Sequence, residues 1–452
     1  GFGDLDIDGD LDIVLGNWSS GLEKLFATDQ SENRVLMRSG DGYEEKSLPG
    51  ISGETNSILI SDINNDHHPD VLVGNDRLVP DLYYLGDGDG GLVPMASDAV
   101  PMTSMFTMSL DAADFNNDGA LDLFSTDMTF ARSSRDDYCA PIVEPAEQAR
   151  CNELLAVYSQ IQNGDVASCH ALDRAVDRQA CFAVFSVQAA KSLQDPAFCT
   201  GLPERPAAMR SLCDYLARPA AAGESIDQNA YTPQVQRNTL LLGGANGFSE
   251  QAEALGAASS FWSWNAKAAD LDNDGWQDIY VGNGFHFGEN FFEIQDNILF
   301  RNGGGQGFEE AQVAWGVNDP VNTPSYTYLD FDVDGDLDIV ATGVIAQPRV
   351  YVNELDSGYA TGIALHDERG NSFGIGSVVT VTTGGDDAMT QTREMRLSGG
   401  FLSFDNPVLY FGTGDQRIVD AITVTWPDGE ITRIPGPLDT SGTYQISRRV
   451  LR

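Results

Sequence analysis

The sequence predicts a mainly β protein built from repeated four-stranded sheets, the blades of a β-propeller. A nine-residue motif occurs five times in the 452 residues, and a strand-like apolar run follows every copy. The copies begin at residues 4, 62, 114, 270 and 330, so three of the four intervals are 52 to 60 residues long. Four strands in about 55 residues is the size of one propeller blade. The 47 Gly and 19 Pro provide for the many turns of such a fold.

The repeated motif has the form D-x-[DN]-x-D-[GH]-x-x-D. Side-chain oxygens at positions 1, 3, 5 and 9 can converge on one point, with a backbone carbonyl expected at position 7. Several carboxylates at flexible spacing form a hard-cation cage that suits Ca²⁺ better than Mg²⁺, so we predict about five Ca²⁺ ions, one in each loop. The predicted side-chain ligands are Asp4, Asp6, Asp8, Asp12, Asp62, Asn64, Asp66, Asp70, Asp114, Asn116, Asp118, Asp122, Asp270, Asp272, Asp274, Asp278, Asp330, Asp332, Asp334 and Asp338. The predicted carbonyl ligands are Asp10, His68, Ala120, Trp276 and Asp336.

These loops differ from EF-hands, which need a bidentate Glu at position 12 and a helix on either side. Position 12 is apolar or small in all five copies, and short strand-like runs such as 13–15 and 71–73 lead up to it. The motif therefore predicts Ca²⁺ loops between β-strands. Solvated Asp-rich turns without metal are the alternative, which is disfavoured because five copies share the same oxygen positions.

A second strand-like element follows each loop, and in four units a Gly-rich turn and an apolar or aromatic residue come next. The five elements are 33–37, 81–85, 238–242, 297–300 and 349–353. Each unit is thus a strand, a loop, a strand and a hairpin, and the blades are predicted over 1–130 and 231–357. The one interval of 156 residues is a unit with an insertion, 131–230, between its second and third strands.

The charge balance is strongly acidic: 26 Lys and Arg stand against 68 Asp and Glu, a formal net charge of −42. Binding to nucleic acid or to an anionic membrane surface needs a basic patch, and the chain has little material for one. No apolar run reaches the roughly 18 residues of a membrane-spanning helix, so no transmembrane segment is predicted. The five loops hold 20 of the acids. The others predict a diffuse acidic surface, suited to solubility and to cationic or Ca²⁺-bridged partners.

All six cysteines fall in the insertion, at intervals that repeat about every 30 residues. This internal repeat predicts the disulfides Cys139–Cys151, Cys169–Cys181 and Cys199–Cys213, among the many pairings that six cysteines allow. Helix-like stretches follow Cys151 and Cys181, so a disulfide-rich α-helical lobe is predicted over 131–230. Metal binding by these cysteines is less favoured, because no C-x-x-C occurs. Disulfides imply an oxidising location: extracellular, cell-surface or periplasmic.

Beyond residue 357 the repeat stops. The segment 358–452 has alternating strands, such as 377–382, 421–426 and 444–446, separated by Gly, Asp and Pro turns. Alternation over several short strands predicts a small β-sandwich as the C-terminal domain.

Two resemblances follow from these motifs. The Asp loops, with blade starts such as Gly1-Phe2-Gly3-Asp4, resemble FG-GAP/VCBS repeats, the Ca²⁺-binding blades also seen in integrin α-chain heads. The C-terminal segment resembles the ASPIC/UnbV domain, which follows FG-GAP repeats in the cartilage acidic protein family and its secreted bacterial relatives. The matching stretches of that domain are 370–376, 398–403, 409–414 and 424–429.

The first resemblance implies a propeller of about seven blades. Only five loops are present here, and the first strand of the first blade is missing. We therefore expect that the sequence lacks an N-terminal part, and a propeller closed with five blades is the alternative. The Cys-rich insertion departs from the simple family pattern.

Three functions stay open at this point. The loops, the disulfides and the resemblance favour a secreted or cell-surface calcium-binding protein that acts as an adhesion or ligand-binding module for a protein or glycan. A structural subunit of an extracellular filament, sheath or surface assembly, formed by self-assembly, is the alternative. A propeller-based polysaccharide-active enzyme is less favoured, because metal binding explains the carboxylates and no H-E-x-x-H occurs; no catalytic residue is predicted. The aromatic stretch 285–292 either lines a ligand surface or, as we favour, packs in the interior.

Overall fold

The computed structural model describes residues 1–17, 32–49, 54–76, 80–96, 98–128, 149, 232–244, 247–287, 291–293, 295–319, 321–344, 346–355, 357–384, 388–440 and 442–448. Apart from Ala149, these residues belong to one compact unit. The unit is mainly β, as predicted. The predicted helical lobe and its three disulfides lie outside the described residues. In the described part of the chain, no helix combines the length and the apolar character needed to cross a membrane.

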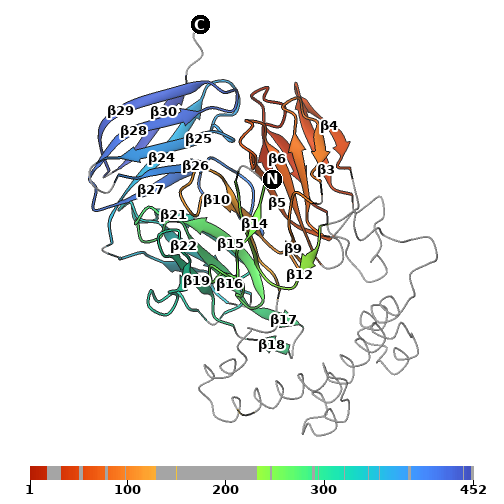
Figure 1. The fold of residues 1–452 in the computed structure, drawn as a ribbon, viewed down its shortest axis with the longest axis vertical. Helices are drawn as coiled ribbons and strands as arrows, with labels where there is room; N and C mark the ends of the chain where they lie inside the picture. Colours follow the sequence, from red (N-terminus) through yellow and green to blue (C-terminus); the bar gives the residue numbers. More distant parts are fainter. Residues whose placement is uncertain are drawn as a thin grey trace, which may run out of the picture. The chain divides into compact units, whose positions relative to one another are not determined.

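Five antiparallel sheets follow one another along the chain, each with its strands in sequence order (Figure 1). The first contains β1 (Phe2–Gly3), β2 (Asp12–Leu15), β3 (Arg34–Ser39) and β4 (Gly42–Ser47). The expectation that its first strand is missing is therefore wrong, because Phe2 and Gly3 pair with β2. The second contains β5 (Glu54–Ser61), β6 (Asp70–Asp76), β7 (Leu82–Gly86) and β8 (Leu92–Pro94). The third contains β10 (Leu110–Ala113), β11 (Asp122–Ser125), β13 (Thr239–Leu242) and β14 (Ser249–Glu250). The fourth contains β15 (Ser263–Ala269), β16 (Asp278–Asn283), β19 (Ile298–Asn302) and β20 (Phe308–Glu310), and the fifth β21 (Ser325–Leu329), β22 (Asp338–Thr342) and β23 (Arg349–Tyr351).

Each nine-residue motif joins the first and second strands of its sheet, and the last Asp of the motif is the first residue of the second strand. In the third sheet, β11 and β13 are paired neighbours although residues 126–238 separate them in sequence. This is the place where the sequence predicts the insertion. Two short pairs flank the sheets: β9 (Thr103–Ser104) with β12 (Gln234–Val235), and β17 (Phe285–Phe287) with β18 (Phe291–Glu293).

Alternating side chains of the second strands fill the spaces between the sheets. In β6, Val71 and Val73 pack with the first sheet, whereas Leu72 packs with the third. The same alternation in β16 places Ile279 between the third and fourth sheets and Tyr280 between the fourth and fifth. Because successive residues of a strand point to opposite faces, one strand serves two cores. Four apolar clusters thus join the five sheets in order. The first strands of the second to fifth sheets, β5, β10, β15 and β21, lie side by side.

The C-terminal domain consists of two sheets that share one apolar core. One sheet has the order β27 (Val408–Gly414), β24 (Tyr359–Asp367) and β30 (Thr443–Arg448). The other has the order β26 (Thr390–Glu394), β25 (Val378–Thr383), β28 (Ile418–Thr425) and β29 (Ile431–Asp439). Trp426, at 1% exposure, and Phe411 are the largest buried side chains between them. Two sheets packed face to face on one core form the sandwich that the alternating strands predict.

A buried acid away from the metal motifs gives the second sheet a pH-sensitive contact. The carboxylate of Asp81 accepts hydrogen bonds from the Asn75 amide (2.9 Å) and the Thr107 hydroxyl (3.0 Å). Burial outweighs these hydrogen bonds and raises the pKa of Asp81 from 3.8 to about 8. Because the folded value is the higher one, the stabilising contribution is fully present below about pH 4 and is lost as the pH rises through about 8.

We therefore expect the melting temperature, measured in saturating calcium, to fall between pH 6 and pH 9 and to fall less steeply in Asp81→Asn. The side-chain amide of Asn offers one acceptor and one donor to Asn75 and Thr107, but it does not ionise. Asp98→Asn is the control, because Asp98 is an exposed acid of the same region. In this variant the melting temperature should fall with pH as steeply as in the natural chain. Equal slopes in all three proteins would contradict this assignment.

Candidate metal-binding loops

The five motifs adopt one local backbone conformation. Positions 4 and 6 of every loop have a positive φ, between 52° and 102°. The residues at position 4 are Ile7, Asn65, Asn117, Asn273 and Val333, and those at position 6 are Gly9, His67, Gly119, Gly275 and Gly335. Asn and Gly suit this region, whereas a β-branched residue there is strained. Ile7 and Val333 therefore hold a conformation that the surrounding loop imposes on them.

Replacing Val333 by Asn tests this conformational strain. Val333 is 85% exposed, so the change removes almost no buried apolar surface. We expect Val333→Asn to stabilise the fold by about 1 kcal/mol, because Asn enters the left-handed region at lower cost. Asn65→Val, the reverse change at the same position of the second loop, is expected to destabilise by a similar amount. Urea unfolding of both variants measures the two effects, and changes of the same sign would contradict the explanation.

Backbone amides of each loop bind the Asp residues at positions 1 and 5. In the first loop, the Gly9 amide donates to Asp4 at 3.0 Å and the Asp10 amide donates to Asp8 at 2.8 Å. The same two bonds recur in the other four loops, with Asp62, Asp114, Asp270 and Asp330 as the position-1 acceptors. These bonds fix the position of the carboxylates in the turn. They use the amides of positions 6 and 7 and not the carbonyl of position 7, which is the predicted ligand.

The Asp at position 9 ties its loop to the rest of the sheet. In the first loop, Asp12 accepts the amide of Leu5 at 2.8 Å and the amide of Arg38, in β3, at 2.7 Å. The second acceptor bond always reaches the third strand of the sheet or a residue at most two positions beyond its end. The position-9 residues of the other loops, Asp70, Asp122, Asp278 and Asp338, make the same pair of bonds. Position 9 is thus a structural acceptor in addition to its predicted role as a ligand.

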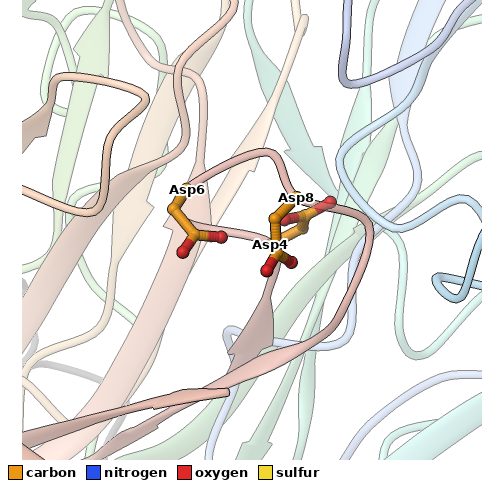
Figure 2. Close-up of side chains that lie close together, drawn as sticks. All are labelled: Asp4, Asp6 and Asp8. Carbon is orange, nitrogen blue, oxygen red and sulfur yellow. The ribbon is translucent and has the colours of Figure 1, made fainter. Parts of the chain in front are cut away.

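Three of the loops bring carboxylate oxygens together. Asp4, Asp6 and Asp8 each offer an oxygen, and the three oxygens lie within 4.8 Å of one another (Figure 2). The fourth loop does this with Asp270, Asp272 and Asp274, and the fifth with Asp330, Asp332 and Asp338. The donor set is entirely oxygen, which is the set that hard cations prefer.

Some of these oxygens are buried and lack a hydrogen-bond partner among the described residues. They are Asp4 Oδ1, Asp6 Oδ1, Asp270 Oδ1 and Asp272 Oδ1. Burial first, and then the nearby carboxylates of Asp8, Asp12 and Asp6, raise the pKa of Asp4 to about 7. The pKa of Asp270 is also raised to about 7, again by burial first. The attraction of a cation between the carboxylates would offset both their desolvation and their repulsion, so the residues present fit a divalent ion.

The second and third loops carry fewer acids. Asn64 donates an amide N–H to Asp66 at 2.9 Å, and Asn116 donates to Asp118 at 3.0 Å. Each of these two loops has three Asp, against four or five in the others. Since affinity for Ca²⁺ rises with the number of charged ligands, these two loops are expected to bind it more weakly.

Two arginines from outside the motif border the fourth loop. Arg301, in β19, contacts Asp272 at 2.6 Å and Asp274 at 3.1 Å. Arg393, in β26 of the C-terminal domain, contacts Asp270 at 3.4 Å. Sequence reasoning did not find either residue, because nothing in the motif specifies which distant strands pack beside it. Their charges offset half of the four Asp charges in this loop.

Comparison with protein families shows what the two parts of the chain are. Residues 62–125 match the model of an FG-GAP-like repeat, and residues 367–449 match the model named ASPIC and UnbV. The chain carries an FG-GAP-like repeat and an ASPIC and UnbV domain. This confirms the architecture expected from the resemblances. FG-GAP repeats are typical of extracellular proteins.

Comparison with individual proteins adds less. No curated protein matches the chain. Among solved structures, the crystal structure of the V. cholerae biofilm matrix protein Bap1 is similar with 8% sequence identity and a TM-score of 0.22. The match covers 94% of this chain and 58% of that one. The FG-GAP repeat and the ASPIC and UnbV domain therefore remain the basis for assigning function.

Proposed function

We propose that the chain is a secreted or cell-surface calcium-binding protein that acts as an adhesion or ligand-binding module. In this proposal the five sheets are blades of a β-propeller. The observation that supports it best is the convergence of carboxylate oxygens in the first, fourth and fifth loops. Four of the acid oxygens in the first and fourth loops are buried without a partner among the described residues.

The ions have a structural role in this proposal. Asp4, Asp6 and Asp8, with the carbonyl of Asp10, would hold an ion in the first loop. A bound ion supplies positive charge to carboxylates that repel one another without it. Because Asp12 anchors the same loop to β3, an ordered loop also orders the start of β2. The two Asn-containing loops are weaker members of the same set.

The partner is proposed to be a protein or glycan at the cell surface. A formal net charge of −42 favours cationic or Ca²⁺-bridged ligands and disfavours nucleic acid. A structural subunit of an extracellular filament, sheath or surface assembly is the second candidate. The native oligomeric state separates the two: a discrete monomer that captures a ligand supports the first, and an ordered polymer supports the second.

An enzymatic role is not part of the proposal. The letters G-x-S-x-G do occur at 370–374, which is the sequence of a nucleophile elbow. A nucleophile elbow joins a strand to a helix, whereas this stretch is a turn between strands β24 and β25. Turnover of a polysaccharide in calcium buffer would nevertheless revive the polysaccharide-active enzyme.

Calcium binding by the intact chain tests the proposal. We expect isothermal titration with CaCl₂, after removal of metal, to show three tighter sites and up to two weaker ones. Mg²⁺ should compete poorly, because it demands a stricter octahedral geometry. Replacing Asp6 and Asp8 together by Asn is expected to remove one of the tighter sites. Absence of heat and of bound calcium at millimolar concentration would reject the proposal.

A further inference from the structure

The fourth loop lies against the ASPIC and UnbV domain. The amide of Gly412, in β27, donates to Asp270 Oδ2 at 3.1 Å, and the amide of Gly414 donates to the Asn273 carbonyl at 2.8 Å. Arg393, from β26, reaches the same Asp270 oxygen at 3.4 Å. Two strands of the domain therefore meet one metal loop of the sheets.

The two carboxylate oxygens of Asp270 have different surroundings. Its Oδ2 accepts the loop's own Gly275 amide at 3.0 Å as well as the Gly412 amide and Arg393. Its Oδ1 is buried and has no hydrogen-bond partner in the described part of the chain. Asp270 also offers an oxygen to the group that it forms with Asp272 and Asp274. One oxygen thus serves the domain, and the other is left for a cation.

Residues 395–407 connect β26 to β27 and are here called the strap. The strap runs along the first strands of the sheets. The Gly399 amide donates to the Ile58 carbonyl of β5 at 2.7 Å, and the Gly400 amide donates to the Leu110 carbonyl of β10 at 2.8 Å. Farther along, the Phe401 amide donates to Asn265 of β15 at 2.8 Å. The strap therefore forms hydrogen bonds with three sheets. The residues that it contacts in these sheets lie more than 50 positions apart in the sequence.

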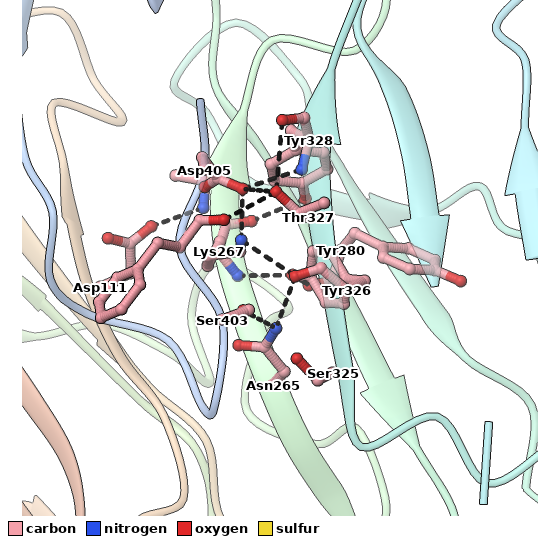
Figure 3. A network of polar contacts seen from close by, with 12 residues as sticks. Asp111, Asn265, Lys267, Tyr280, Ser325, Tyr326, Thr327, Tyr328, Ser403 and Asp405 are labelled. Carbon is pink, nitrogen blue, oxygen red and sulfur yellow. Dashed lines mark hydrogen bonds and ion pairs between the residues drawn. The ribbon is translucent and has the colours of Figure 1, made fainter. Parts of the chain in front are cut away.

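An ion pair between a buried lysine and a half-buried aspartate holds the end of the strap. Figure 3 shows the ammonium group of Lys267 beside the carboxylate of Asp405, close to the rings of Tyr326 and Tyr328. Lys267 is 4% exposed, and Asp405 also accepts the Tyr328 amide at 2.8 Å. At its other end, the strap follows Glu394, which accepts the amide of Asp62 in the second loop at 3.3 Å. The strap thus begins beside the second loop and ends at Lys267, in the strand that leads into the fourth loop.

We propose that cation binding in the fourth loop and docking of the ASPIC and UnbV domain, with its strap, are thermodynamically linked. Arg393 and Gly412 are positioning residues that hold Asp270 for the cation. The inference rests on the proposed function, since it requires a cation in this loop. Linkage is reciprocal: if docking strengthens cation binding, the cation strengthens docking by the same factor.

Gly412 provides a test that changes no charge. A Cβ at this position would lie 2.3 Å from Asp270 Oδ2 and 2.5 Å from backbone atoms of Asn273, so Gly412→Ala must push β27 away from the loop. Gly442→Ala is the matched control, because a Cβ there meets no atom within 4 Å. Both glycines belong to the same domain, and neither change replaces a predicted ligand; the Cβ of Gly412→Ala acts on Asp270 only by displacing it or β27.

The experiment uses the full chain and CaCl₂, with calorimetric titration and hydrogen exchange as the two measurements. In the natural chain, calcium is expected to slow exchange of the Gly399, Gly400 and Phe401 amides about tenfold or more relative to EDTA. In Gly412→Ala, one of the tighter sites should weaken about tenfold, and the three amides should lose protection in calcium. Gly442→Ala should match the natural chain in both measurements.

Arg393→Gln is the second variant, in case Gly412→Ala fails to fold. Its readout is exchange alone, because removing a positive charge near the cation changes affinity in its own right. We expect the calcium-dependent protection of the strap to disappear, whereas Arg433→Gln, at an exposed position of β29, keeps it.

Two failures can be told apart. If calcium binds the natural chain but leaves strap exchange unchanged, or if Gly412→Ala binds calcium as tightly as the natural chain, the linkage is overturned and the proposed function stands. If the natural chain binds no calcium, the proposed function fails and the linkage fails with it.

Discussion

Removing calcium from the intact chain with EDTA should lower its melting temperature by about 10 °C or more. At a free calcium concentration of a hundred times the dissociation constant, one site adds about 2.7 kcal/mol to the free energy of unfolding. Three tighter sites would then add about 8 kcal/mol, and about 10 °C or more is the corresponding shift for a large domain. Calorimetric melting curves in CaCl₂ and in EDTA measure the difference.

The control is EDTA saturated with calcium beforehand, which should leave the melting curve as it is in CaCl₂ alone. Adding excess calcium after EDTA should restore the higher melting temperature. The same melting curve with and without free calcium would reject a structural role for the ion, whatever the titration shows.

Replacing Asp12 by Ala should destabilise the protein by about 2 to 4 kcal/mol even in EDTA. The change leaves the Leu5 amide and the Arg38 amide without their acceptor, and each unsatisfied buried group costs about 1 to 3 kcal/mol. Asp12 is 1% exposed, so water does not replace the carboxylate at little cost. Urea unfolding in EDTA measures this cost separately from any loss of calcium.

Asp8→Ala in the same loop is the matched comparison. Asp8 is exposed and belongs to the converging group with Asp4 and Asp6. In EDTA this variant should stay within about 0.5 kcal/mol of the natural chain, as surface changes usually do. In calcium it should lose about 2.7 kcal/mol, the contribution of one site. If Asp8→Ala were the more damaging change in EDTA, the division between anchoring and ligating positions would be wrong.

The loops show how far local sequence reasoning reaches. Positions 1, 3 and 5 of the motif lie two residues apart, and every copy has the same two left-handed residues. In the first and fourth loops this local turn brings the carboxylate oxygens of these three positions together. Placement of the second strand at the end of the motif, beginning at position 9, follows from the apolar run that the sequence shows there. Both features depend on contacts within about ten residues, and both could be predicted.

The role of position 9 lay beyond that reach. Its carboxylate looks like one more ligand in the sequence, yet one of its oxygens accepts an amide within the third strand or at most two residues beyond its end. That amide lies 15 to 121 residues away from it in the chain. The motif contains no information about which amide it will be.

What the sequence by itself determined is the repeated unit: an acidic loop between two strands, the spacing of its side-chain oxygens, and the change to a second β domain after the last repeat. The tertiary structure alone decided what surrounds those loops. Arg301, Arg393 and Gly412 meet the fourth loop from three strands, and the strap crosses strands of several sheets. The physical reason is range: a tight turn sets its own geometry, whereas a buried contact between distant strands depends on how complete sheets pack.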